Sequence, residues 1–168
     1  MQYQKEVRKQ IAKGLLVLGG VIVIGWVEIP GFSERQRLAI LSGSILLLAI
    51  PLFLSIAAVI IGRYSSESLI FGYKSTDDGL SFKQAYLQNT LEQTSANVLP
   101  LIALGLVVPG VYLKVCIIQA ASFCIGRVMY FLGYKRDPME RFTGFVVGWY
   151  SAAIAYLVAA YFVVITIN

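Results

Sequence analysis

Residues 38–61 read LAILSGSILLLAIPLFLSIAAVII, a run of 24 residues without a charged side chain. At a rise of about 1.5 Å per residue, a helix of this length crosses a hydrocarbon core about 30 Å thick. A second run without a charge covers the 27 residues from 142 to 168. Two such runs in a short chain predict an all-α integral membrane protein with one membrane domain.

The composition agrees with a membrane location. Of the 168 residues, 58% are hydrophobic and 14% are charged, whereas an average soluble domain is about 45–50% apolar. The absence of histidine excludes histidine metal sites and Ser-His or Cys-His catalytic dyads, and we expect no metal. Cys116 and Cys124 lie eight residues apart in one predicted membrane helix, too far along it for a mutual disulfide.

Three further segments complete the predicted membrane domain. Residues 11–29 can span, since only Lys13 and Glu28 interrupt them. Residues 82–134 are too many for one crossing, and Val108-Pro109-Gly110 divides them because proline and glycine end helices. The sequence therefore predicts five spanning helices, at residues 11–29, 38–62, 83–108, 111–134 and 142–167.

The distribution of positive charge predicts the orientation. With the N-terminus in the cytoplasm, eleven of the fourteen lysines and arginines lie inside, and Arg35, Arg37 and Lys114 lie outside. This asymmetry is what the positive-inside rule describes. We expect a multi-pass protein with a cytoplasmic N-terminus, in the plasma (inner) membrane if it is bacterial. Because topology explains the net charge of +5, we expect no nucleic-acid partner.

Polar side chains lie inside two predicted membrane helices, where an ionisable group costs about 2.5–3.5 kcal/mol on insertion scales. At about 100° per residue, one face of the third helix carries Asn89, Glu92 and Gln93. One stripe of the fourth carries Arg127, Tyr130 and Tyr134, and Arg141 follows the next loop. Because the two helices form a hairpin that opens toward the cytoplasm, these groups lie at similar depth and can converge on one site.

Two interpretations of this cluster are open. In the structural one, Glu92 and Arg127 form an intramembrane ion pair that fixes the hairpin register, and the tyrosines form an interfacial belt. In the functional one, the surplus of arginines, amides and phenols over a single carboxylate binds an anionic ligand that makes many hydrogen bonds.

The same residues resemble a known family. Asn89-x-x-Glu92, followed by Arg127-x-x-Tyr130-x-x-Gly133-Tyr134 and then Arg141, resembles the MAPEG family, whose members include microsomal glutathione transferases. The resemblance runs from about residue 38 to the end. It implies a four-helix bundle over about residues 37–168, assembled as a homotrimer. The helix at 11–29 is extra to that bundle.

The resemblance also implies glutathione as co-substrate, bound between subunits near the cytoplasmic face. Asn89 and Glu92 would hold its polar and amino groups, and Arg127 would order Glu92 or a glutathione carboxylate. Arg141 would lie beside the sulfur and favour the thiolate. The rest of the implied pocket is lined by Tyr130, Tyr134 and Gln93, with Arg63 lent by a neighbouring subunit.

The leading functional hypothesis is a glutathione-dependent membrane transferase or peroxidase that acts on lipophilic electrophiles arriving through membrane lipids. The family's glutathione-using members commonly have an arginine where this chain has Ala85. That difference favours the alternative, a non-catalytic MAPEG-like bundle that binds another anionic amphiphile or protein partners. A transporter is disfavoured because the polar groups lie near one membrane face and the sequence shows no inverted repeat.

Overall fold

The computed structural model describes residues 2–64 and 78–167, and its regular structure is entirely helical over these ranges. The elements in chain order are α1 (Gln2–Glu28), the 3₁₀ turn η1 (Glu34–Gln36), α2 (Arg37–Arg63), α4 (Asp78–Val107), the 3₁₀ turn η2 (Gly110–Tyr112), α5 (Lys114–Arg136) and α6 (Arg141–Ile167). The predicted all-α class is confirmed.

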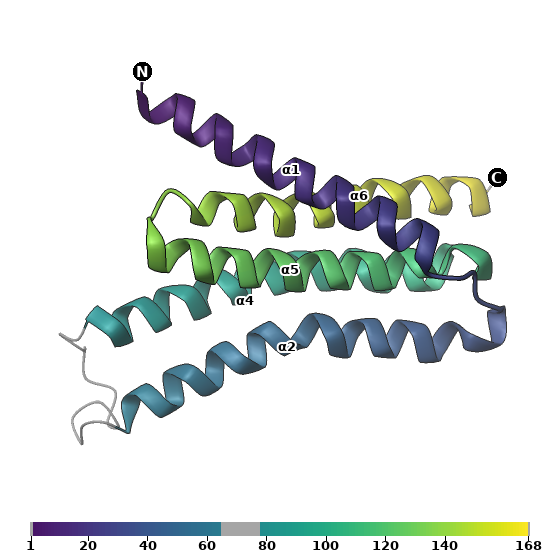
Figure 1. Ribbon diagram of the computed structural model, residues 1–168. Helices are drawn as coiled ribbons and strands as arrows, with labels where there is room; N and C mark the ends of the chain where they lie inside the picture. The colour runs from purple at the N-terminus through teal and green to yellow at the C-terminus, as the bar shows by residue number, and fades with distance from the viewer. Residues whose placement is uncertain (1, 65–77, 168) are drawn as a thin grey trace.

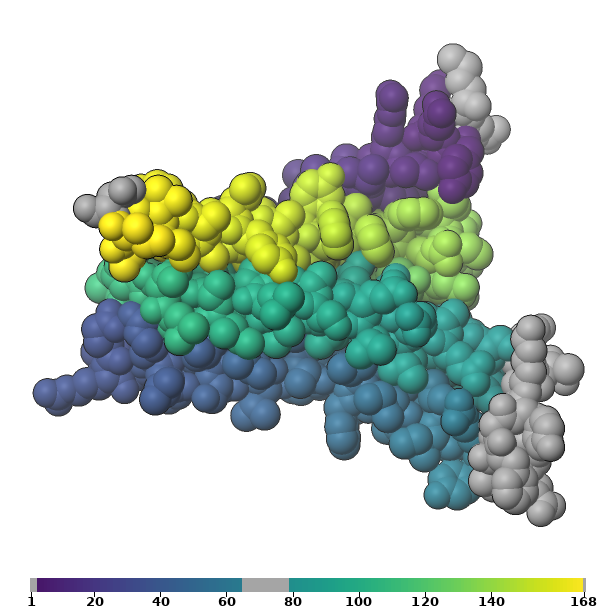
Figure 2. All heavy atoms as spheres, turned by 180° about the vertical axis from the view of Figure 1, so that it is seen from behind, coloured from purple at the N-terminus to yellow at the C-terminus, as the bar shows by residue number. Residues whose placement is uncertain are grey.

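The four helices α2, α4, α5 and α6 run side by side in alternating directions, and α1 crosses the outside of α5 and α6 obliquely (Figure 1). The first turns of α1 project away from the other helices (Figure 2). A four-helix bundle with one additional helix is therefore present. α1 begins at Gln2, well before the predicted start at residue 11, because its charged N-terminal turns continue the helix beyond the apolar segment.

Among the described residues, four helical segments are long and apolar enough to cross a membrane: Tyr3–Glu28, Glu34–Arg63, Gly110–Arg136 and Arg141–Ile167. The fifth helix, α4, is more polar because its first half carries the amides and the carboxylate singled out above. It packs between α2 and α6. That α4 also spans, and that the N-terminus lies in the cytoplasm, stay predictions.

The predicted break at Val108-Pro109-Gly110 separates α4 from η2. The last carbonyls of a helix lack partners inside it. At the end of α4 the missing hydrogen-bond donors come from Arg37. Its Nη1 donates to the carbonyl of Gly105 (2.6 Å) and its Nη2 to the carbonyl of Val108 (2.8 Å). Glu34 accepts the Gly110 N–H at 2.6 Å and also pairs with Arg37. The start of α2 thus caps the α4–α5 hairpin.

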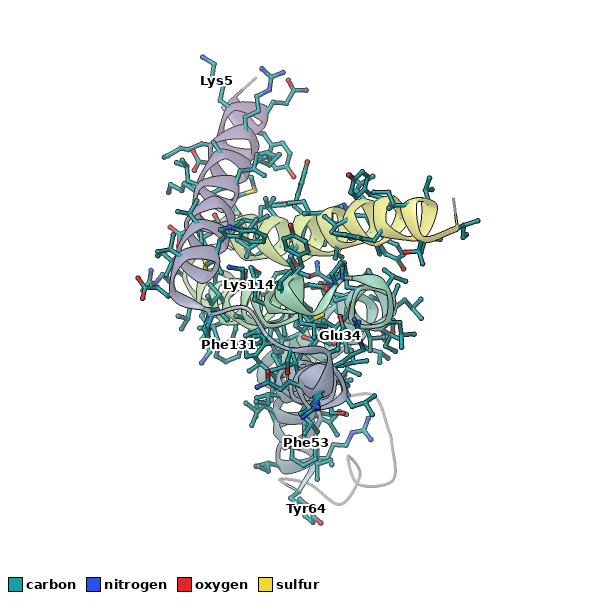
Figure 3. All side chains as sticks on the ribbon, turned by 90° about the vertical axis from the view of Figure 1, so that its right-hand side faces the viewer. Lys5, Glu34, Phe53, Tyr64, Lys114 and Phe131 are labelled. Carbon is teal, nitrogen blue, oxygen red and sulfur yellow. The ribbon has the colours of Figure 1, made fainter. Side chains whose placement is uncertain are left out.

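Lys114 caps the C-terminal end of α1 in the same way. Its Nζ donates to the carbonyl of Trp26 at 2.8 Å and lies 4.4 Å from the centroid of the Trp26 ring. Figure 3 looks at this end of the bundle, with Glu34 and Lys114 labelled. Nearer the N-terminus of α1, the Thr143 hydroxyl of α6 donates to Oε1 of the buried Gln10 at 2.6 Å. The extra helix is therefore anchored to the bundle at two separate positions.

Glycines allow α5 and α6 to approach closely at the level of the polar cluster. A Cβ built on Gly126 would lie 2.8 Å from the backbone nitrogen of Gly148, and one on Gly144 would overlap the backbone nitrogen of Tyr130. Small residues permit such backbone contacts between membrane helices. These glycines set the separation of the two helices that carry the tyrosines and Arg141.

We predict that Gly144→Ala lowers the free energy of unfolding by about 1–3 kcal/mol, because the added methyl group must push α5 and α6 apart. Unfolding in detergent micelles, followed by circular dichroism, measures the change. The matched control is Gly19→Ala, where an added Cβ meets nothing within 4 Å, and where replacement of a helical glycine should stabilise by up to about 1 kcal/mol. Equal destabilisation of both variants would contradict the close-packing argument.

Candidate functional site

An open pocket of about 380 Å³ lies between α4, α5 and α6. It contains four of the residues that the sequence singled out, namely Asn89, Glu92, Tyr130 and Arg141. Its other lining residues are Ala85, Gln88, Phe142 and Phe145. These groups lie at one level, as the helical periodicity of the sequence predicts, because each comes from a continuous helix and the α5–α6 turn is short.

Arg127 lies beneath the pocket and is fully buried, with 0% of its surface exposed. Its Nη1 donates to Asn89 Oδ1 and its Nη2 to Thr90 Oγ1, both at 2.8 Å. The guanidinium is also sandwiched between two rings, 4.9 Å from the centroid of Tyr86 and 4.4 Å from that of Tyr130. Arg127 therefore fixes the orientation of an amide and a phenol that face the pocket.

The ion pair between Glu92 and Arg127, which the structural interpretation of the cluster predicted, is wrong. The implied role of Arg127 in ordering Glu92 or a glutathione carboxylate stays a prediction. Within residues 2–64 and 78–167, the ion pairs are Lys9–Glu6 and Arg37–Glu34. Asn89 and Thr90 lie on the side of α4 that meets Arg127, whereas Glu92 is exposed and accepts a hydrogen bond from Gln88 at 2.9 Å. The carboxylate consequently faces outward at the pocket.

Arg141 is the first residue of α6, and its guanidinium carbon lies 5.0 Å from the centroid of the Tyr134 ring. It forms no ion pair with any described residue. A Cβ on Gly133 would lie 2.7 Å from the carbonyl carbon of Glu140, so this glycine lets the chain return tightly enough to place Arg141 at the pocket. Its guanidinium donors remain available to an anionic ligand.

Tyr134, Gln93 and Arg63 do not line the pocket within the described chain. Tyr134 contacts it through Arg141 and through Tyr130, whose ring centroid is 6.0 Å away. Gln93 is 3% exposed and turns toward α6, where a Cβ on Gly148 would overlap its amide oxygen. Arg63 ends α2 with an exposed side chain. Its implied role toward a neighbouring subunit stays a prediction.

Sequence reasoning missed Tyr86 and Thr90, which complete the environment of Arg127. Thr90 Oγ1 donates to the Tyr86 carbonyl at 2.7 Å, and Tyr86 Oη donates to the Arg127 carbonyl at 3.3 Å. Their spacing could have revealed them, since residues 86, 89, 90 and 93 lie on adjacent turns of one helical face. The aromatic and hydroxyl character of Tyr86 and Thr90 gave no cue that they would face an arginine.

A second cavity, of about 400 Å³, lies on the opposite side of the Tyr86–Arg127–Tyr130 stack, between α2, α4 and α5. Tyr130 lines the first pocket, whereas Tyr86 and Arg127 line this one. Its walls are largely apolar and include Leu47, Ile50, Leu54, Val128 and Phe131. Ile50, Leu54 and Val128 are about half exposed or more, so the cavity is accessible from the lipid side.

One face of α4 is exposed along its whole length. Its residues are spaced alternately four and three apart, the repeat that is typical of a coiled-coil seam. These exposed residues are Ser81, Ala85, Gln88, Glu92, Ser95, Leu99, Ile102 and Leu106. Ala85, Gln88 and Glu92 also line the pocket, so the pocket opens onto this seam.

Comparison with curated proteins and with solved structures gave no match. A sequence model of the MAPEG family does match, over residues 41–161. The matched region extends from α2 into α6 and contains every residue of the pocket. Because the match covers the greater part of the chain and all of its polar cluster, the chain belongs to the MAPEG family.

Proposed function

We propose that this protein is a glutathione-dependent membrane transferase or peroxidase that acts on lipophilic electrophiles. The observation that carries the proposal is the convergence, in one 380 Å³ pocket, of the Glu92 carboxylate, the Arg141 guanidinium and the Asn89 amide. Glutathione has an ammonium group, peptide groups and a thiol, which suit the carboxylate, the amide and the guanidinium respectively. Arg127 holds the Asn89 oxygen, which leaves the amide N–H groups of Asn89 directed away from it.

Arg141 suits the chemical step. A thiol with a pKa of about 8.5 is mostly protonated at neutral pH, and a nearby cation increases the thiolate fraction. In the proposed reaction the thiolate attacks an electrophilic carbon, a C–S bond forms, and the leaving group departs with its electron pair. Arg141 would stabilise the thiolate, and no other cofactor is required for conjugation.

The apolar cavity supports a lipophilic second substrate. The Tyr86–Arg127–Tyr130 stack separates this cavity from the pocket. The cavity is accessible from the lipid side. A compound dissolved in the bilayer can enter such a cavity without crossing water.

The exposed seam of α4 supports assembly as a homotrimer. A carboxylate and an amide facing lipid are costly, and a heptad seam is buried when helices of several chains pack together. Three copies of α4 around a common axis would bury Gln88 and Glu92 at the boundary between subunits. Arg63 of a neighbouring chain would then be the added cation that the resemblance implies.

Thermal unfolding in detergent tests glutathione binding directly. A ligand that binds only the folded state stabilises it by about 2.7 kcal/mol at a concentration of 100 Kd. We predict that millimolar glutathione raises the Tm of the parent by several degrees and that Glu92→Ala abolishes most of the shift. The control Glu6→Ala, on α1 outside the pocket, should retain it. No shift for the parent would contradict glutathione binding.

Ala85 favours the second candidate, a non-catalytic bundle that binds another anionic amphiphile. It is exposed and lines the pocket, so the pocket lacks a cation at that position. Ala85→Arg separates the candidates. In a glutathione site, the new guanidinium should tighten glutathione binding through a bidentate carboxylate contact. If neither the parent nor the variant binds glutathione, the second candidate is favoured.

A further inference from the structure

A third cavity, of about 180 Å³, lies where α1 crosses α5 and α6. Its outer wall is formed by Leu18, Ile22 and Trp26 of α1, which precede the region matched by the family model. It shares no lining residue with the pocket of the proposed function. Trp26 and Ile154 are 46% and 40% exposed, so the cavity opens toward the lipid side.

Two of the polar side chains that line this cavity each carry an atom without a hydrogen-bond partner among the described residues. Gln119 is 5% exposed and Ser122 is 1% exposed. Gln119 Nε2 donates to the Asn97 carbonyl at 3.0 Å, but Gln119 Oε1 and Ser122 Oγ find no hydrogen-bond partner within residues 2–64 and 78–167. Buried polar groups are normally satisfied. Both atoms are almost fully buried, so a ligand in the cavity reaches them once the two side chains turn toward it. An unpaired acceptor and an unpaired hydroxyl on the wall of a cavity open to lipid indicate a missing hydrogen-bonding group.

Ser151, the third polar residue that lines the cavity, has hydrogen-bond partners. Ser151 Oγ donates to the Gly148 carbonyl at 2.8 Å and lies 3.2 Å from Asn97 Oδ1. The requirement therefore comes from Gln119 and Ser122 alone. They lie three residues apart on α5, which places their side chains next to each other on one helical face.

The chemistry of the two atoms selects the ligand. A hydroxyl group satisfies both, because it donates to Gln119 Oε1 and accepts from the Ser122 hydroxyl. A carbonyl satisfies only Ser122. A charged ligand would have no counter-ion in the wall, since none of the described residues that line the cavity is ionisable. The remaining walls are aliphatic apart from Trp26 and require an apolar body.

We propose that this cavity is a binding site for a membrane-soluble phenol or alcohol of about the size of one aromatic ring. A cavity of about 150 Å³ accommodates benzene, so about 180 Å³ fits such a ring with its hydroxyl group. Gln119 and Ser122 hold the hydroxyl, and α1 holds the apolar body against α5 and α6. The extra helix thus creates a ligand site that the four-helix bundle alone lacks.

Quenching of Trp26 fluorescence tests the site. The chain has two tryptophans, and Trp149→Phe leaves Trp26 as the single reporter at the cavity wall. The probes are 4-bromophenol and 4-bromoanisole, which share the bromine quencher and differ in the donating hydroxyl. We expect saturable quenching by the phenol, with binding about five- to tenfold tighter than that of the anisole, the discrimination typical of one hydrogen bond.

Three variants in this Trp149→Phe background show which residues bind the probe. Ser122→Ala should weaken 4-bromophenol binding about five- to tenfold. The control Ser44→Ala removes another buried, unpartnered hydroxyl, which lies on α2 outside the cavity, and should leave binding unchanged. Val158→Phe, at a partly exposed lining position, should abolish saturable quenching by filling the cavity.

Three results would overturn the proposal. They are quenching that stays linear with probe concentration, equal binding of phenol and anisole, and equal effects of Ser122→Ala and Ser44→Ala. Equal binding would mean that water satisfies the two polar atoms. If Ser122→Ala does not fold, judged by circular dichroism, the comparison of the two probes together with Val158→Phe still decides the question.

Discussion

Replacement of Arg141 by alanine is expected to lower kcat/KM for conjugation of glutathione with an aryl halide by about 10²–10³-fold, the usual effect of losing one group that stabilises developing or bound anionic charge. Glutathione binding should change little. Arg141 has no ion-pair partner among the described residues, so its loss removes a cation from the pocket together with the contact to the Tyr134 ring and leaves no buried charge unpaired.

The pH dependence provides a second readout for Arg141. Without the cation, the glutathione thiol returns to a pKa of about 8.5, so the rate of Arg141→Ala should rise as the pH increases toward that value, narrowing the difference from the parent. The matched control is Arg136→Ala, an exposed arginine at the end of α5 outside the pocket. Unchanged turnover in Arg141→Ala would remove this residue from the mechanism.

Replacement of Arg127 by methionine is expected to lower the free energy of unfolding by about 3 kcal/mol, since hydrogen bonds from a charged group contribute about 1.5–3 kcal/mol each. The substitution removes the bonds to Asn89 and Thr90 and the cation between two aromatic rings. Thr90 keeps its bond to the Tyr86 carbonyl. Asn89 loses its fixed orientation, so glutathione affinity should fall as well.

Denaturant unfolding in detergent measures the effect of Arg127→Met. Arg127→Lys should be intermediate, because an ammonium group keeps the charge but does not reproduce the fork that reaches two acceptors. The control is Arg8→Met on the exposed N-terminal part of α1, where the expected change is within about 0.5 kcal/mol. If Arg127→Met is as stable as the control, the buried arginine does not organise the site.

Much of the architecture follows from the sequence, because its causes are local. The helix break at Val108-Pro109-Gly110 was predictable since proline lacks an N–H and cannot continue a helix. The convergence of Asn89, Tyr130 and Arg141 was predictable because a short hairpin and a short turn determine their depth. Apolar runs long enough to span predict the ends of α2, α5 and α6 to within about three residues, whereas α1 and α4 begin earlier because their polar first turns continue the helix.

The rotation of each helix about its own axis was not predictable in this way. Asn89, Glu92 and Gln93 share one face on a helical wheel, yet they point to three different environments. Asn89 meets Arg127, Glu92 is exposed at the pocket, and Gln93 is buried against Gly148. A difference of some tens of degrees in rotation exchanges these partners, and sequence periodicity does not resolve it.

By itself, therefore, the sequence determined that this chain forms a membrane bundle of five helices with a polar cluster between the third and fourth. Only the tertiary structure decided that Arg127 pairs with Asn89 instead of Glu92, and that α1 encloses a separate cavity above Gln119 and Ser122. Helix length and depth depend on residues close in sequence. Helix rotation depends on contacts such as Gly126 against Gly148, which exist only once the helices have packed.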